Sequence, residues 1–188
     1  MYFFVPYQLT GIQQGIQSGH AALEFALRYG RYNPDHMIWD FIEKYKTWVI
    51  LNGGTTNLGY QGEGKGTLDL IWNSLILYNI DARLDDKIDA ERFYEPDLNN
   101  AMTAICFVCD ERVFNKDLYP DFIDFILNVK MYPDARRMIS KEKEKGLKSL
   151  TNSDYERLFP EFYSEWLILI GGEQTAFLKE LINGKKLA

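Results

Sequence analysis

Three short apolar runs most constrain how this chain can fold. They cover residues 2–7, 46–51 and 102–108, and the run at 46–51 is rich in β-branched and aromatic side chains. Runs of this length bounded by turn formers predict buried strands. Segments with helical periodicity lie between them, and one further short strand is expected near 82–84. We therefore predict an α/β fold of two or three layers, with a mixed, mostly parallel four-stranded sheet and flanking helices.

The chain changes character after residue 113. A helix start at 119–121 is followed by a highly charged segment at 136–148 and by an aromatic and aliphatic segment at 158–170. A final short helix is expected at 173–181, after two glycines. The pattern predicts an α/β domain over residues 1–113 and an all-helical extension over 114–188.

Charge and hydropathy restrict the class of protein further. The net charge of -6 argues against a general duplex-binding protein, which usually carries a strongly basic face. No apolar run reaches the ~20 residues of a membrane-spanning helix. Residues 1–6 are apolar but have no basic residues before them and no cleavage-like stretch after them. A cytoplasmic protein without membrane contact is expected.

The two cysteines, Cys106 and Cys109, form a Cys-x-x-Cys pair inside an apolar run. Such a pair can be a redox motif or half of a zinc site. A second pair is missing, and His20 and His36 are distant in sequence. In a strand the two thiols would point to opposite faces. We predict reduced cysteines that act as small apolar side chains, with no metal and no cofactor.

The helix expected over 12–29 carries two different stripes. Its predicted apolar face consists of four residues at spacings of four and seven: Ile12, Ile16, Leu23 and Leu27. A neighbouring stripe of small residues contains Gly15 and Gly19. Each glycine costs a helix about 1 kcal/mol relative to alanine. A close approach of this helix to a sheet or a ligand is expected to offset that cost.

Four polar residues, Gln13, Gln17, His20 and Glu24, share another face of the same helix. In one interpretation they form a site in which His20 relays a proton and the two glutamines hold a water or a substrate carbonyl. The helix N-terminus would then face an anionic group. The other interpretation is a solvent-facing polar stripe, and the pattern alone leaves both open.

The segment Gly11-Ile12-Gln13-Gln14-Gly15-Ile16-Gln17-Ser18-Gly19-His20-Ala21-Ala22 follows the first apolar run. It resembles the first helix of type II peptidyl-tRNA hydrolases, where a Gln, two small residues, a His and an Ala recur in that order. Gln17, His20 and Ala21 match position for position. The order of elements is also similar, as is the acidic loop before the last strand. The resemblance covers residues 1–113, and the departures described below make the chain similar to a divergent, bacteriophage-type member of the family.

The resemblance implies hydrolysis of the ester between a peptide and tRNA, with His20 as the proton relay and Glu95 or Asp97 orienting it. It also implies four substrate-binding residues: Gln13, Gln17, Thr103 and Asn52. Two departures stand out. Gln13 occupies the position of a family lysine, seven residues before the His, and the family's Asp-Ala-Gly-x-Thr-Gln loop is not reproduced. The missing lysine, the acidic net charge and the added helices favour the alternative of a non-catalytic binding protein whose partner is a nucleotide, a tRNA end, a host protein or a second copy of the chain.

Three other features have competing interpretations. Glu95 and Asp97 either orient His20 or stabilise a turn around Pro96. The glycine-rich run 53–66 matches no phosphate-binding motif and favours a lid or flexible loop over a nucleotide cradle. The basic cluster favours a solvated helix over a tRNA contact, because its members alternate with Glu142 and Glu144: Arg136, Arg137, Lys141, Lys143, Lys145 and Lys148.

Overall fold

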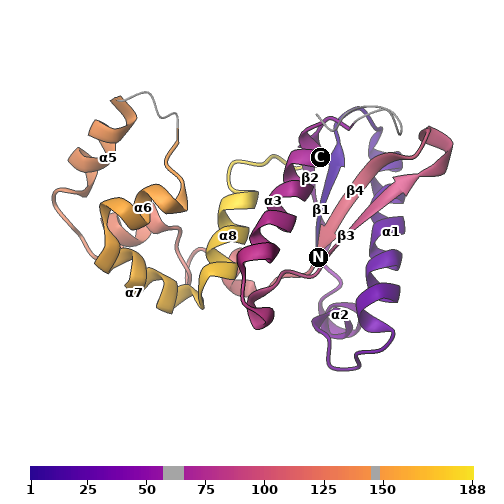
Figure 1. Cartoon of the computed structure of the whole chain (residues 1–188), viewed down its shortest axis with the longest axis horizontal. Helices are drawn as coiled ribbons and strands as arrows, with labels where there is room; N and C mark the ends of the chain where they lie inside the picture. Colours follow the sequence, from indigo (N-terminus) through magenta and orange to yellow (C-terminus); the bar gives the residue numbers. More distant parts are fainter. Residues whose placement is uncertain (57–65, 145–148) are drawn as a thin grey trace. The chain divides into compact units, whose positions relative to one another are not determined.

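The computed structural model describes residues 1–56, 66–144 and 149–188 (Figure 1). The chain divides into two compact units, one formed by residues 1–109 with 184–188 and the other by residues 110–183. The sequence prediction placed its single boundary at 113/114. Each unit is considered by itself below.

The first unit contains a four-stranded mixed sheet in the order β2-β1-β4-β3. Its strands are β1 (Tyr2–Pro6), β2 (Val49–Gly54), β3 (Ala90–Glu95) and β4 (Ala101–Phe107). β1 pairs with β2 in parallel, whereas β4 is antiparallel to both β1 and β3. The α/β class is confirmed, but the expected mostly parallel sheet is wrong, because β3 and β4 form a hairpin.

The hairpin explains why the prediction failed here. The strand expected near 82–84 is absent, and a short 3₁₀ turn, η3 (Leu84–Asp86), lies in that region. β3 instead occupies residues 90–95, part of which was expected to be loop. A second 3₁₀ turn, η4 (Pro96–Leu98), joins it to β4, with Asn99 and Asn100 in the left-handed region. Asparagine tolerates this conformation, so the chain can reverse within a few residues.

Helices cover both faces of the sheet (Figure 1). On one face lies α1 (Gly11–Phe25), which continues as the π-helical turn η1 (Ala26–Gly30), followed by α2 (Met37–Asp40) and η2 (Phe41–Tyr45). On the other face lies α3 (Thr67–Asp81), which buries Leu68, Ile71 and Leu75. The core beneath α1 is formed by side chains from three elements: Phe3, Val5, Ala21, Phe25, Ala104 and Cys106.

The face that α1 turns toward the sheet is not the predicted one. Its buried residues are Gln14, Gln17, Ser18, Ala21 and Phe25, whereas the predicted apolar stripe is 50–80% exposed (Ile12, Ile16, Leu23 and Leu27). Buried polar groups are tolerated because they find partners inside the fold. Gln14 Nε2 donates to the Pro6 carbonyl at 3.3 Å, and Ser18 Oγ donates to the Gln14 carbonyl at 2.8 Å.

The two helix glycines do not approach the sheet closely. Among the described residues, a methyl group at Gly15 would have no neighbour within 4 Å, and one at Gly19 would lie 3.9 Å from the Trp48 ring. Gly53 in β2 is different, because a methyl group there would lie 2.5 Å from Leu68 Cδ2 and 3.1 Å from Phe4 Cβ. It is therefore in β2, and not in α1, that close packing requires a glycine.

Residues 53–66 were predicted to form one glycine-rich loop. Gly53 and Gly54 belong to β2, and Gly66 is the N-cap of α3. The rest of the predicted run, 57–65 with Lys65, lies outside the described residues. Of the predicted basic cluster, Lys145 and Lys148 also lie outside them, and the remaining members belong to α5 (Ala135–Glu144).

The second unit is helical. It contains η5 (Glu111–Val113), α4 (Phe122–Asp124), η6 (Phe125–Val129), α5, α6 (Asn152–Leu158), α7 (Pro160–Ile170) and α8 (Glu173–Ile182). Phe122 lies at the centre of its core, where it contacts five aromatic rings: Phe125, Tyr155, Phe159, Tyr163 and Trp166. Trp166 Nε1 donates to the Pro120 carbonyl at 2.8 Å. No described helix of the chain has the length and apolarity needed to cross a membrane.

Neither cysteine forms a disulfide, and only Cys106 is buried. Cys106 lies in β4, and its Sγ donates to the Ala21 carbonyl at 3.4 Å. Burial raises the pKa of the Cys106 thiol. Cys109 was expected within the same strand, but β4 ends at Phe107 and Cys109 is half-buried after it. The thiolate is the species that reacts with alkylating reagents, and burial suppresses it. Alkylation of Cys106 therefore requires the first unit to open and can be used to measure that opening.

Gly53→Ala and Gly15→Ala are expected to shift stability in opposite directions. The first overpacks the contact with Leu68 and should cost about 1–3 kcal/mol, while the second removes a helix glycine with open space around it and should gain up to about 1 kcal/mol. The measurement is the rate of Cys106 alkylation at a fixed, sub-denaturing urea concentration. It should rise at least several-fold for Gly53→Ala and fall for Gly15→Ala. Equal rates for the two variants would contradict the packing described here.

Candidate functional site

The site begins with the way in which α1 starts. Thr10 is the N-cap, and its hydroxyl accepts a hydrogen bond from the Gln13 amide while Gln13 Oε1 accepts one from the Thr10 amide at 3.0 Å. This reciprocal capping box satisfies two backbone donors at the helix end. Gln13 is exposed and engaged in this cap. The predicted substrate-binding role of Gln13 therefore competes with its part in starting the helix.

Four of the predicted site residues do come together, on α1, β3 and β4. Thr103 Oγ1 donates to Gln17 Oε1 at 2.7 Å, and Gln17 Nε2 donates to Glu95 Oε2 at 2.6 Å. Thr103 and Gln17 are buried. His20 lies one turn after Gln17, with its Nδ1 3.9 Å from the same Glu95 oxygen. We call Gln17, His20, Glu95 and Thr103 the His20 cluster.

A β-bulge in β4 accounts for the position of Thr103. Phe93 pairs with Ala104 and Tyr94 pairs with Met102, so Thr103 has no partner in β3. The extra residue allows both Thr103 and Ala104 to face α1, where one bonds Gln17 and the other joins the core beneath the helix. Bulges are common beside functional sites because they redirect one side chain.

His20 combines a buried nitrogen with an accessible ring. Its Nδ1 is inaccessible to solvent and has no hydrogen-bond partner among the described residues, although the side chain as a whole is 44% exposed. The ring packs on Phe93, with 4.7 Å between ring centroids. Nε2 lies across the ring from the buried Nδ1. A carboxylate near Nδ1 favours a proton there and leaves Nε2 to exchange a proton with a bound molecule.

The other predicted residues lie elsewhere. Asn52 is in β2, where its Oδ1 accepts from the Gly54 amide at 2.8 Å and its backbone amide donates to the Lys186 carbonyl. It shapes the end of β2 rather than joining the His20 cluster. Asp97 is exposed on η4, beyond the end of β3. Of the two predicted carboxylates, the one beside His20 is Glu95.

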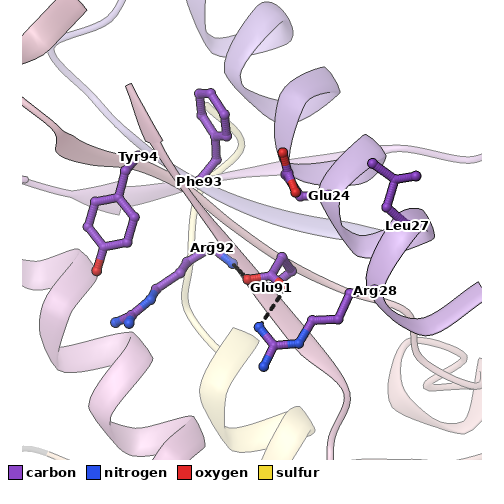
Figure 2. Close-up of a pocket in the computed structure, with 7 residues that line it drawn as sticks. All are labelled: Glu24, Leu27, Arg28, Glu91, Arg92, Phe93 and Tyr94. Atoms are coloured by element: carbon purple, nitrogen blue, oxygen red, sulfur yellow. Dashed lines mark hydrogen bonds and ion pairs between the residues drawn. The ribbon is translucent and has the colours of Figure 1, made fainter. Parts of the chain in front are cut away.

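Sequence reasoning missed a groove between α1–η1 and β3 (Figure 2). It has a volume of about 550 Å³ and seven lining residues: Glu24, Leu27, Arg28, Glu91, Arg92, Phe93 and Tyr94. We call it the α1–β3 groove. Phe93 belongs to both the groove and the surroundings of His20. The available signal was the alternation of Glu91, Phe93 and Glu95 in β3, which places these three side chains on one face.

The two arginines of the groove contact other protein groups, whereas Glu24 is exposed. Arg28 Nη1 lies 2.9 Å from Glu91 Oε2, and this buried partner raises the pKa of the Arg28 guanidinium. Glu91 Oε1 also accepts the Arg92 amide at 3.0 Å. The Arg92 guanidinium lies over the Trp72 and Tyr94 rings, at 4.7 and 5.1 Å. Both arginines are thus engaged within the protein.

The described residues hold no group of three or more His, Cys, Asp or Glu side chains arranged to bind a metal ion. The arrangement can instead support proton transfer by His20, with Glu95 held in place by Gln17 and Thr103.

The fold defines a class, a three-layer α/β unit with a mixed four-stranded sheet. Comparison with protein-family models, curated proteins and solved structures finds no match to this chain. The resemblance to type II peptidyl-tRNA hydrolases accordingly rests on the chain's own residues.

Thr103→Val is expected to destabilise the first unit by about 1–3 kcal/mol, because it leaves Gln17 Oε1 buried without its donor. Thr47→Val is the control, since the Thr47 hydroxyl is exposed and bonds only locally to the Tyr45 carbonyl, and it should change stability by less than about 0.5 kcal/mol. Urea dependence of Cys106 alkylation measures both. The double variant Gln17→Ala/Thr103→Val should cost less than the sum of the single changes, and strict additivity would contradict the coupling.

Proposed function

We propose that this chain is a peptidyl-tRNA hydrolase-like enzyme that hydrolyses the ester between a peptide and the 3′ adenosine of tRNA. The observation that carries the proposal is the environment of His20. One ring nitrogen is inaccessible to solvent and lies beside a carboxylate, while the side chain as a whole is 44% exposed. The match of Gln17, His20 and Ala21 to the family helix adds support. This function implies tRNA as the partner and the cytoplasm as the location.

The reaction needs a placed water and a proton relay. His20 Nε2 accepts a proton from water as the water oxygen attacks the ester carbonyl. The tetrahedral intermediate then collapses, the bond from carbon to the ribose oxygen breaks, and His20 returns the proton to that oxygen. Glu95, 3.9 Å from Nδ1, stabilises the imidazolium formed in between. This separation is longer than a hydrogen bond, and such contacts often shorten when a substrate binds.

Within this mechanism, Gln17 and Thr103 act through Glu95 rather than on the substrate. Both amide atoms of Gln17 are already engaged, one by Thr103 and one by Glu95. They fix the carboxylate and leave the accessible face of His20 to the ester. We therefore assign them as positioning residues in place of the substrate-binding role first expected.

A second candidate is a non-catalytic binding protein on the same fold. The observation that favours it is the role of Gln13, which caps α1 where the family has a lysine. A site without that cation provides less stabilisation for a developing oxyanion. The partner would then be a nucleotide, a tRNA end, a host protein or a second copy of the chain.

Release of free tRNA from purified peptidyl-tRNA tests the proposal. His20→Ala should slow release by about 10²–10⁴-fold, the usual contribution of a general acid–base group. Glu95→Gln should also slow it, whereas Asp97→Asn should not, because Asp97 is exposed two residues beyond the cluster. Native protection of Cys106 from alkylation serves as the folding control for each variant.

Two results would overturn this assignment. Equal loss in the Glu95→Gln and Asp97→Asn variants would show that Glu95 has no special role beside His20. If the wild-type chain released no tRNA above the buffer rate, the proposed enzymatic function would be excluded. Retention of peptidyl-tRNA on a filter by that inactive chain would then support the binding protein.

A further inference from the structure

The α1–β3 groove starts where the His20 cluster ends. Glu24 lies four residues after His20 on α1, so the two side chains are neighbours on one helix face. Phe93 contacts the His20 ring and also lines the groove. A substrate whose reacting bond lies at His20 therefore extends into the groove if it follows α1 toward η1.

The chemistry of the groove disfavours the phosphate side of an ester substrate. Arg28 is paired with the buried carboxylate of Glu91, and Arg92 points to the α3 side of the sheet, where its guanidinium lies over the Trp72 ring (Figure 2). Glu24 adds an exposed negative charge. A polyanion would meet an unpaired carboxylate and no uncommitted arginine among the residues that line the groove. Charge complementarity thus favours a neutral or cationic occupant with N–H donors.

The groove also offers apolar surface of a suitable kind. Leu27 is 57% exposed, and Phe93 forms part of the opposite wall on β3. A few apolar contacts combined with a small number of polar groups are typical of ligand sites of about 300–1,000 Å³. An amino-acid side chain between Leu27 and Phe93 would place the adjoining backbone N–H within the field of Glu24.

The edge of β3 limits how this occupant can bind. β3 is the last strand in the sheet order, so one side of its backbone is not paired with a strand. Two of its groups are already bonded by side chains: the Ala90 carbonyl accepts from the Tyr29 hydroxyl at 2.9 Å, and the Arg92 amide donates to Glu91. Side chains that cover an edge in this way oppose addition of a further strand. The occupant is therefore recognised by side-chain contacts in the groove.

We infer that the α1–β3 groove binds the peptide portion of the ester substrate, an inference that rests on the function proposed above. Leu27 and Phe93 contact the side chain of the residue next to the ester, and Glu24 accepts a hydrogen bond from its amide or ammonium group. The Arg28–Glu91 ion pair closes the far end. The site therefore distinguishes substrates by their acyl group rather than by their nucleotide.

The test uses a probe that contains neither ester nor tRNA, N-acetyl-leucyl-leucinamide. Its binding to the full chain is followed by NMR, with saturable shifts expected at Leu27 and Phe93. Leu27→Asp should weaken binding at least tenfold. Leu23→Asp is the matched control, because Leu23 is 66% exposed on the same helix but does not line the groove, and its variant should bind as the wild type does.

The outcomes separate this inference from the proposed function. Saturable peptide binding that Leu27→Asp alone weakens supports the groove, even if the chain releases no tRNA. If the chain releases tRNA with a KM that Leu27→Asp does not change, the hydrolase function stands and peptide binding by the groove is rejected. Absence of peptide binding to the wild type, or equal weakening by both substitutions, also overturns it. Cys106 protection again identifies any variant that has lost its fold, and Glu24→Gln then serves as a second, isosteric probe.

Discussion

The hydrogen-bonded chain from Thr103 through Gln17 to Glu95 is the interaction on which the rest of the site depends. A buried glutamine would be costly if either of its amide atoms were unpaired, and here each meets one partner of the opposite kind. These hydrogen bonds join the middle of α1 to β3 and β4. They therefore fix the Glu95 carboxylate beside His20 and also set how α1 lies on the sheet.

This arrangement requires an irregular sheet. A regular β4 would alternate its side chains, and Thr103 and Ala104 would then face opposite sides. The bulge at Thr103 lets one serve Gln17 and the other the core. A second register shift occurs between Val5 and Pro6, where Gly53 of β2 is the additional residue. The bulge at Thr103 lies opposite Gln17, so β4 is irregular where the site is built.

The sequence predicted an element of the fold or site where the residues that stabilise it are close in sequence, and it failed where they are distant. The α/β class was predicted from three apolar runs. His20 and Gln17 were selected as candidate site residues from their spacing and from their resemblance to a family helix. β3 was missed because its three charged residues give an edge strand no apolar signal, and Glu91 is balanced by an arginine 63 positions away. The prediction of the buried face of α1 was wrong because helical periodicity identifies a stripe without showing whether that stripe is buried. Here Gln14 and Gln17 are buried instead, because they find hydrogen-bond partners inside the fold.

The charges of the site bear on what it can recognise. Tight binding of a nucleic acid comes largely from cations that neutralise phosphates. This chain has a net charge of -6, Gln13 is engaged in the N-cap of α1, and Arg28 of the groove is paired with Glu91. The His20 cluster and its groove thus offer little to a phosphate backbone. If the proposed function holds, this site selects the peptide and the bond that is broken, and it contributes little to discrimination among tRNA sequences.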